Sequence, residues 1–263
     1  MGQIKIVFFD IDGTLVSFET HCVPHSTLEA VHEMRQKGVK VYIATGRPMQ
    51  FIDNLGALEY DGMITVTGAH CFTREGQIIS HCPVPKESVS RVVKYLEKGE
   101  DAYPVIFVST DNLFITEIDE DVKEVLSLLN LKTPPIDRAS RAEREDVLQM
   151  ISFFKADREK VLMEELMPDC TSMRWHPLFT DVITGKVDKA VGIDNVLAYE
   201  RLRLEEAMAF GDGGNDMSML THVKHSVAMG NACDELKAVA TYVTDSVDND
   251  GVAKALKLFG LID

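Results

Sequence analysis

The stretch that decides the fold is KIVFFDIDGTL, residues 5–15. An apolar run that favours a β-strand, Ile6 to Phe9, ends in Asp10 and Asp12, and a Gly-Thr turn follows. Carboxylates at the end of a buried strand are costly unless a cation or a reaction uses them. The alternative is that both aspartates only form a turn, since Asp-Gly is a common turn signal. The stretch therefore predicts a buried strand with a candidate acidic site at its carboxyl end.

The composition is that of a globular protein with one large domain or two smaller ones. The chain has 263 residues, of which 45% are hydrophobic and 26% are charged, and its formal net charge is -15. This negative charge argues against nucleic-acid binding, which needs clustered Lys and Arg. No apolar run is long enough to span a bilayer, and Asp10 and Asp12 interrupt the N-terminal run that would otherwise resemble a signal peptide.

The cysteines indicate a reducing compartment. The chain contains 5 of them, an odd number, and they are widely spaced without a C-x-x-C pair. We therefore expect neither a disulfide framework nor a zinc site, and we expect a cytoplasmic location.

Strands and helices alternate in the first and last parts of the chain. Strand-like runs that end in tight turns cover residues 39–44, 62–69 and 207–210. Helical stretches cover residues 28–38, 189–199, 234–239 and 252–259, and the first of them follows a capping-box pattern at 26–29. This alternation predicts an α/β fold with a Rossmann-like parallel sheet and helices on both faces.

Between about Ile78 and Lys186 the pattern changes to a mixture of short strands and helices. Strand-like runs cover 105–109, 114–116, 147–154 and 181–183, and helical stretches cover 88–98, 121–129 and 158–167. The mixture predicts an inserted α+β domain. Within it, we expect the charged, Pro-containing segment 133–146 to be a solvated loop. The cluster Arg174 to His176 near Asp181 is a candidate sugar contact, although a Trp in such a cluster is more often a packing residue.

Three of the predicted strand ends carry polar residues, at 10–14, 45–47 and 212–216. Ligands bind at the carboxyl ends of strands in an open parallel sheet, so these three junctions can converge on one crevice. The third junction lies in a Gly-rich turn, which lets the backbone approach a ligand; a plain flexible loop is the alternative there.

The acidic residues of these junctions indicate a metal. Asp212 and Asp216 would join Asp10 and Asp12, and four carboxylates cannot stay ionised together without a cation. A set of oxygen ligands with no His or Cys nearby favours Mg²⁺ over Ca²⁺ or Mn²⁺.

Two further positions carry weaker signals. Thr45 and Gly46 precede a predicted helix start at Pro48, and helix N-termini bind anions. Thr45 could instead cap that helix, and the two roles are compatible. Lys189 starts the helix after the insertion, but a lone lysine is normally a solvated surface residue.

Taken in order, the segments DIDGT (10–14), TGR (45–47), Lys189 and GDGGND (211–216) resemble the four motifs of haloacid-dehalogenase-superfamily (HAD) phosphatases. The resemblance is closest to the Cof-type branch, bacterial sugar-phosphate phosphatases with an α+β (C2B-type) cap inserted between the second and third motifs. It covers nearly the whole chain, including DGVA at 250–253. It implies a Rossmannoid catalytic core at residues 1–80 and 186–263 and a substrate-specificity cap at 81–185. One departure is Thr67, where the branch often has Asn.

The resemblance implies a role for each matched residue. Asp10 would be the nucleophile that becomes an aspartyl phosphate, and Asp12 would be the general acid and then the general base. Thr45 and Lys189 would hold the phosphoryl oxygens, as further catalytic residues.

The metal and substrate sets follow in the same way. The residues implied to bind Mg²⁺ are Asp10, Asp12 (through its main-chain carbonyl) and Asp212, with Asp216 helping through a water molecule. The residues implied to bind substrate are Thr45, Gly46, Arg47, Lys189 and Asn215, of which Asn215 would orient the loop or the lysine.

The sequence therefore predicts a Mg²⁺-dependent phosphatase for small phosphorylated metabolites, with hexose phosphates favoured. One alternative is a phosphomutase or phosphotransferase on the same core. A signalling receiver also phosphorylates an Asp at the end of a parallel strand, but it has no use for a large insertion. We expect a small phosphorylated partner and no nucleic-acid or membrane partner. The sequence does not predict the oligomeric state, and a monomer is compatible with it.

Overall fold

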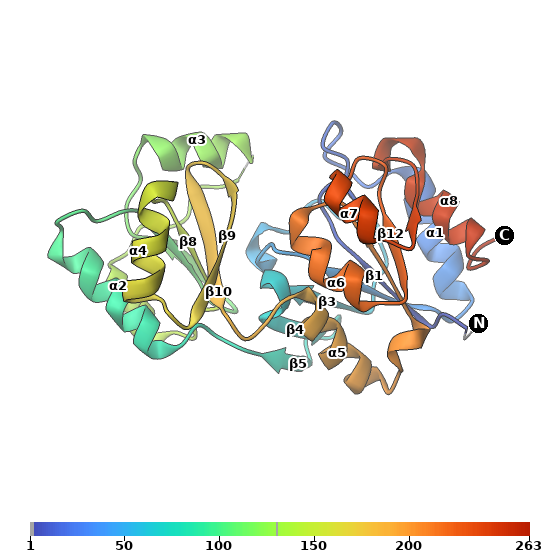
Figure 1. The fold of residues 1–263 in the computed structure, drawn as a ribbon, viewed down its shortest axis with the longest axis horizontal. Coiled ribbons are helices and arrows are strands. Elements are labelled where there is room, and N and C mark those ends of the chain that lie inside the picture. Colours follow the sequence, from blue (N-terminus) through green and yellow to red (C-terminus); the bar gives the residue numbers. More distant parts are fainter. Residues whose placement is uncertain (1–2, 130) are drawn as a thin grey trace. The chain divides into compact units, whose positions relative to one another are not determined.

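The computed structural model describes residues 3–129 and 131–263, which form two compact units (Figure 1). Unit 1 consists of residues up to 47, residues 52–81 and residues 188–263. Unit 2 consists of residues 82–187 together with the short segment 48–51. Unit 1 is thus built from both ends of the chain, and nearly all of unit 2 is one continuous insertion.

Unit 1 contains an eight-stranded sheet in the order β13-β12-β11-β1-β2-β3-β4-β5. The strands are β1 (Ile6–Phe9), β2 (Lys40–Ala44), β3 (Gly62–Thr65), β4 (His70–Thr73), β5 (Ile78–His81), β11 (Ala207–Gly211), β12 (His225–Ala228) and β13 (Tyr242–Val243). Neighbouring strands from β13 to β3 in this order are parallel. Strand β4 is antiparallel to β3, and β5 is antiparallel to β4. Phe9 pairs with both Ile43 and Phe210, so the carboxyl ends of the three central strands are level.

Helices cover both faces of this sheet. The helices α1 (His25–Gln36) and α8 (Gly251–Leu258), blue and red in Figure 1, lie on one face and bury apolar residues against it. The helices α5 (Lys189–Glu200), α6 (Met217–His222) and α7 (Asp234–Val239) bury theirs against the other. The predicted α/β fold with a parallel sheet and helices on both faces is confirmed.

The capping box predicted at 26–29 does not form. Helix α1 begins at His25 after Pro24, and no side chain caps it. Ser26 instead donates its hydroxyl hydrogen to Asp250 Oδ1, 2.5 Å away and 224 positions later in the chain. A long-range partner therefore takes the hydroxyl that the local pattern assigned to the helix.

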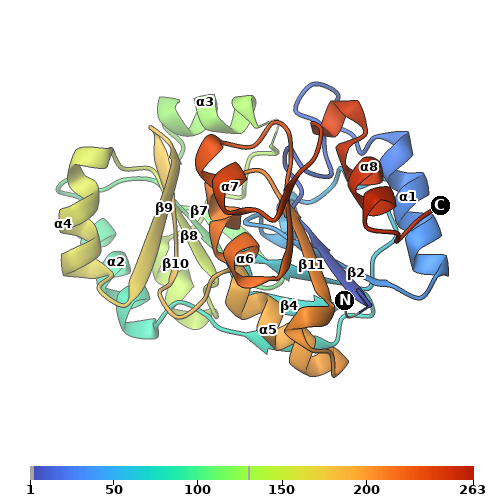
Figure 2. The ribbon, with the colours of Figure 1, turned by 45° about the vertical axis from the view of Figure 1, so that its right-hand side comes forward.

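Unit 2 contains a five-stranded antiparallel sheet in the order β7-β6-β8-β10-β9. The strands are β6 (Val105–Val108), β7 (Leu113–Ile115), β8 (Gln149–Ser152), β9 (Cys170–His176) and β10 (Phe179–Thr184). The helices α2 (Lys86–Lys98) and α4 (Ala156–Leu166) bury residues on one face, and α3 (Glu120–Leu128) does so on the other (Figure 2). The predicted α+β insertion is confirmed.

The segment 133–146 is largely exposed, as its composition predicted, but it is not a plain loop. A short 3₁₀ helix, Ala139–Arg144, buries Ala139 and Ala142 in the apolar cluster of α2, and Ile136 forms a β-bridge with Ile115. The two alanines are a weak apolar signal in a segment with many charges, but they pack against the core of unit 2. Among the residues that the structure describes, no helix has the length and apolar character needed to cross a membrane.

Candidate active site

The candidate site forms where β1, β2 and β11 end. Asp10 directly follows β1, Thr45 follows β2 and Asp212 follows β11. The backbone N–H of Asp10 donates to the carbonyl of Phe210 at 3.1 Å, which continues the strand pairing up to the first acidic residue. The level strand ends therefore bring three junctions from distant parts of the sequence together.

Lys189 supplies the buried positive charge of the site. Its Nζ lies 2.7 Å from Asp10 Oδ1 and 2.5 Å from Asp216 Oδ1, and its side chain has no exposed surface. Burial alone would lower the pKa of Lys189, but the charges of Asp10 and Asp216 raise it above its usual range. The lysine is therefore a cation that joins two of the junctions, and the alternative of a solvated surface lysine is wrong.

Asp216 also fixes the backbone of its own loop. Its second oxygen, Oδ2, accepts hydrogen bonds from the backbone N–H groups of Asp212 and Gly213, each at 2.9 Å. The side chain has no exposed surface. The alternative of a plain flexible loop is therefore wrong. One fully buried carboxylate binds the backbone of the turn through one oxygen and Lys189 through the other.

Three carboxylates converge in this site. Asp10, Asp212 and Asp216 each offer an oxygen, and the three oxygens lie within 4.8 Å of one another. Burial and the charge of Asp216 raise the pKa of Asp10 well above its usual value, although Lys189 acts to lower it. Burial and Asp216 likewise raise the pKa of Asp212 to about 7. One ammonium does not balance three carboxylates, so the donor set fits a hard divalent cation.

The turn at Gly13 requires glycine. Its φ is +80°, and a Cβ there would lie 2.1 Å from Asp212 Oδ2. Thr14, the next residue, donates its hydroxyl hydrogen to Asp212 Oδ1 at 3.2 Å. The DIDGT turn thus packs directly against the Asp212 carboxylate.

Asn231 is a site residue that the sequence reasoning missed. Its side-chain amide nitrogen donates to the carbonyl of Gly13 at 2.8 Å and to Asp212 Oδ2 at 3.1 Å. Its side-chain oxygen accepts from the backbone N–H of Val247 at 3.1 Å. Asn231 therefore links the first turn, the acidic loop and the C-terminal segment. It lies between a strand and a helix, and the residues next to it in the sequence carry no charge. Only its position after β12, another strand of the parallel sheet, could have indicated it.

Asp12 points to a different partner from Asp10. Its two carboxylate oxygens accept from the guanidinium group of Arg47, at 2.7 Å from Nε and 2.5 Å from Nη2. This forked pairing is typical of an ionised carboxylate. Asp12 is not part of the three-carboxylate cluster, and its predicted contribution to the metal through the main-chain carbonyl stays a prediction.

Thr45, Gly46 and Asn215 lie near this pair. The Thr45 hydroxyl oxygen accepts from the backbone N–H of Arg47 at 3.1 Å, so it caps its own turn. A Cβ on Gly46 would lie 3.4 Å from both Asn215 Nδ2 and Thr67 Oγ1. The helix expected at Pro48 is only a single 3₁₀ turn, Met49–Phe51. The structure therefore brings Gly46 and Asn215 together, and it places the atypical Thr67 beside them.

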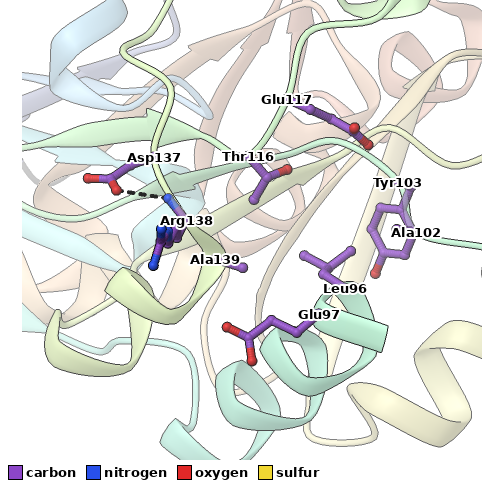
Figure 3. A pocket seen from close by; sticks show the side chains of 9 residues that line it. All are labelled: Leu96, Glu97, Ala102, Tyr103, Thr116, Glu117, Asp137, Arg138 and Ala139. Atoms are coloured by element: carbon purple, nitrogen blue, oxygen red, sulfur yellow. Dashed lines mark hydrogen bonds between the residues drawn. The ribbon is translucent and has the colours of Figure 1, made fainter. Parts of the chain in front are cut away.

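A cavity of about 290 Å³ lies elsewhere, within unit 2 (Figure 3). Its lining residues are Leu96, Glu97, Ala102, Tyr103, Thr116, Glu117, Asp137, Arg138 and Ala139. None of them is a predicted site residue, so this cavity does not belong to the acidic site.

Comparison with known proteins agrees with this geometry. A family model described as haloacid dehalogenase-like hydrolase matches residues 7–256. The chain belongs to the haloacid dehalogenase-like hydrolases. YkrA of Bacillus subtilis, whose name provisionally classes it as a phosphatase, is 34% identical over 98% of both chains.

Two solved structures are similar to this HAD protein over its whole length. One is BT4131, described as a subclass IIB sugar phosphatase, with 42% identity, a TM-score of 0.88 and coverage of 98% of this chain and 100% of that one. The other is BT1666 of Bacteroides thetaiotaomicron, a HAD phosphatase with 36% identity, a TM-score of 0.90 and coverage of 99% and 96%. The protein is a HAD-type phosphatase, and the predicted Cof-type branch with an inserted α+β cap is confirmed.

Proposed function

We propose that this HAD phosphatase is Mg²⁺-dependent and hydrolyses small phosphorylated metabolites, with sugar phosphates as its main substrates. The observation that carries the proposal is the position of Lys189, buried between Asp10 and Asp216 while Asp212 faces the same point. Such a cluster places one fixed positive charge beside a carboxylate that ends a strand, and its excess of negative charge fits a bound divalent cation. The description of BT4131 as a sugar phosphatase supports the choice of substrate class.

Asp10 acts as the nucleophile in this proposal. One of its oxygens bonds to phosphorus as the bond from phosphorus to the leaving oxygen breaks, which gives an aspartyl phosphate. Asp12 gives a proton to the leaving oxygen and, in the second step, takes a proton from the water that attacks phosphorus. That attack releases inorganic phosphate and restores the Asp10 carboxylate.

The ion pair of Asp12 with Arg47 suits the second step. A carboxylate held by a guanidinium group is an acceptor, ready to take the proton of the attacking water. For the first step Asp12 has to carry a proton, and we infer that Arg47 then turns to the substrate. Gly46, Thr45 and Asn215 complete the phosphate-binding side.

Asp10, Asp212, Asp216 and the main-chain carbonyl of Asp12 would hold Mg²⁺. When bound, the ion supplies positive charge that offsets the repulsion between a carboxylate nucleophile and a phosphate, about 4 kcal/mol for one pair of charges 4 Å apart at a surface-like dielectric. Lys189 adds to this effect and holds the phosphoryl oxygens. We assign residues 1–80 and 186–263 to the catalytic core and 81–185 to a cap that selects the substrate.

The test is a screen for phosphate release across a panel of phosphorylated metabolites, with Mg²⁺ and after removal of metal by a chelator. We expect release only with the metal, and we expect the Asp10→Asn variant to lose at least about a thousandfold in kcat because it lacks the nucleophile. Asp53→Asn, at an exposed aspartate of unit 1, is the matched control.

Near wild-type turnover by Asp10→Asn would refute the covalent mechanism. Full activity without metal would refute the role of Mg²⁺. Activity that requires a bisphosphate activator and returns an isomerised sugar phosphate would identify a mutase instead.

A further inference from the structure

A short segment directly after β3 has an unusual backbone. Val66 and Thr67 both have a φ of 50°, in the left-handed region that glycine adopts easily and β-branched residues rarely adopt. Such a conformation is costly and persists only where the surrounding contacts hold it, and it is found most often at active and ligand-binding sites. The side chain that this backbone presents is therefore a candidate for a function.

Contacts on both sides hold Thr67 in this conformation. Its backbone N–H donates to the carbonyl of Thr45 at 3.0 Å. The next residue, Gly68, packs so closely on Asp188 that a Cβ there would lie 2.1 Å from the carbonyl oxygen. Asp188 caps the helix α5. The strained segment is therefore fixed between the turn after β2 and the start of α5.

The side chain of Thr67 carries a hydroxyl group without a partner. The residue is only 4% exposed, and its Oγ1 forms no hydrogen bond with any residue that the structure describes. This oxygen is not closed to solvent, in contrast to the equally unpartnered Oγ of Ser152 in unit 2. A nearly buried hydroxyl group is costly unless a partner completes it. Thr67 Oγ1 is therefore a polar group that a ligand can reach.

Two further donors lie beside this hydroxyl group. A Cβ on Gly46 would lie 3.4 Å from Thr67 Oγ1 and equally far from Asn215 Nδ2, so the two side chains flank the same backbone position. Among the described residues, neither Asn215 Nδ2 nor the backbone N–H of Gly46 finds an acceptor. A hydroxyl group, an amide group and a backbone N–H, all without acceptors, therefore meet at Gly46.

The sheet order places these donors at the end of β1. Strand β1 lies between β11 and β2, and Asp10 follows it directly. Asn215 belongs to the loop after β11, whereas Gly46 belongs to the turn after β2. An asparagine that reaches from one to the other spans the carboxyl end of β1. The donors therefore lie at the same edge of the sheet as Asp10.

Donors of this kind suit an anion with several oxygen atoms, because a phosphoryl group offers acceptors. We propose that Thr67 is a further substrate-binding residue, which donates its hydroxyl hydrogen to a phosphoryl oxygen while Asp10 attacks phosphorus. The strained backbone holds the hydroxyl group in place for this contact. The inference rests on the proposed phosphatase function and deepens it by adding a residue to the phosphate-binding side.

The deciding variant is Thr67→Val, which keeps the branched shape of the side chain and removes only the hydroxyl group. The measurement is the inhibition of p-nitrophenyl phosphate hydrolysis by orthovanadate, an analogue of the phosphoryl group, in the presence of Mg²⁺. We expect the inhibition constant to rise at least about tenfold and kcat/KM to fall similarly, because a hydrogen bond to a charged oxygen is lost. An inhibition constant within about twofold of wild type would overturn the proposal.

Two rescue variants separate this hydrogen bond from a purely structural role. Thr67→Ser keeps the hydroxyl group, and Thr67→Asn supplies an amide donor on a residue that tolerates positive φ. We expect both to restore the inhibition constant to within about threefold of wild type, even though Thr67→Ser loses a buried methyl group and unfolds at a lower temperature than Thr67→Val. Vanadate affinity that follows thermal stability instead of the donor would contradict the proposal.

Thr27→Val is the matched control. Thr27 lies on α1, is 1% exposed and also has an unpartnered Oγ1, but this oxygen is closed to solvent. The substitution removes an equivalent hydroxyl group, and the inhibition constant should stay within about twofold of wild type. If Thr27→Val weakens inhibition as much as Thr67→Val does, the effect arises from core packing and the proposal is wrong.

The two proposals fail in different ways. If the wild-type protein hydrolyses p-nitrophenyl phosphate with Mg²⁺ and orthovanadate inhibits Thr67→Val equally well, only the role of Thr67 is wrong. If no phosphate ester is hydrolysed, the proposed function is wrong. Calorimetric titration of the wild-type and Thr67→Val proteins with orthovanadate then still decides whether Thr67 binds an oxyanion.

Discussion

Each unit has a carboxyl group at its sheet, Asp10 buried in unit 1 and Asp181 partly buried in unit 2, and the two groups are compensated differently. In unit 1, Asp10 and Asp216 share the buried ammonium of Lys189. In unit 2, Asp181 accepts a hydrogen bond from the neutral indole of Trp175, and among the described residues it forms no ion pair with a Lys or Arg. In the first arrangement the carboxylates are paired with a charged group, as phosphoryl chemistry requires. In the second arrangement no charged partner is left behind when the carboxyl group is neutralised. We therefore expect removal of Lys189 to destabilise the fold and neutralisation of Asp181 to stabilise it.

Removal of the cation in unit 1 should have the largest effect. Lys189→Met leaves Asp10 and Asp216 buried without their partner, and breaking a buried pair in this way costs about 3–5 kcal/mol. We expect a loss of that size in urea unfolding and at least about a thousandfold loss of phosphate release.

Lys123→Met is the matched control, because Lys123 forms an exposed pair with Glu120 on α3. Its stability should change by less than about 1 kcal/mol. A Lys189 variant that is as stable as this control would show that the buried cluster has another source of compensation.

Loss of Asn231 should have an intermediate effect on metal binding. In Asn231→Ala, Asp212 Oδ2 and the Gly13 carbonyl lose a common donor, and groups that orient metal ligands typically affect affinity about 10- to 100-fold. We expect calorimetric titration with Mg²⁺, without substrate, to show a dissociation constant at least about tenfold higher.

Asn249→Ala removes a surface asparagine that donates only to the nearby Ser246, and it serves as the control. Equal Mg²⁺ affinity in the two variants would show that Asp212 is positioned without Asn231.

Neutralising the carboxyl group of Asp181 in unit 2 should have the smallest effect on the stability of the fold. It should raise the stability, whereas loss of Lys189 should lower it. Asp181 has a pKa of about 6 in the folded protein, above the unfolded value of about 3.9. The folded state therefore holds this proton more tightly. The resulting penalty is absent below about pH 4, grows between pH 4 and 6, and is complete above pH 6.

Asp181→Asn carries no such penalty, so it should be more stable than wild type by about 3 kcal/mol near pH 7.5 and lose this advantage near pH 4. Thermal unfolding at the two pH values measures the difference. An advantage that does not depend on pH would assign the effect to packing and not to the charge.

The sequence predicted the fold of unit 1 well because its signals are local. The apolar run before Asp10 and the Gly-rich turn at Asp212 indicate strand ends by themselves, and parallel topology then brings them together. The helix predicted at 234–239 coincides with α7 for the same reason. The partner of a side-chain hydroxyl group is not a local signal of this kind. The pattern at Ser26 indicated a helix cap, but the hydroxyl group donates to Asp250, near the other end of the chain.

Other parts could not be predicted because they depend on tertiary contacts. By residue type alone Lys189 resembles any surface lysine, and the resemblance to the HAD motifs singled it out as a site residue. Its burial between two aspartates depends on the sheet order. Asn231 has no local pattern, since its partners belong to three separate segments. Strand β9 was not predicted, because its residues are largely polar and each of them is either exposed or only partly buried.

The position of β1 between β2 and β11 has a consequence for how the protein is made. The ribosome releases β1 and β2 early, but β11 follows only after the whole of unit 2 has been synthesised. One edge of a strongly apolar strand is therefore unpaired for most of translation, which makes it a candidate for chaperone binding or aggregation. The continuous stretch 82–187 is synthesised without interruption, so unit 2 can fold on the nascent chain. The acidic site can form only later, when the residues that pair with its first segment have been synthesised.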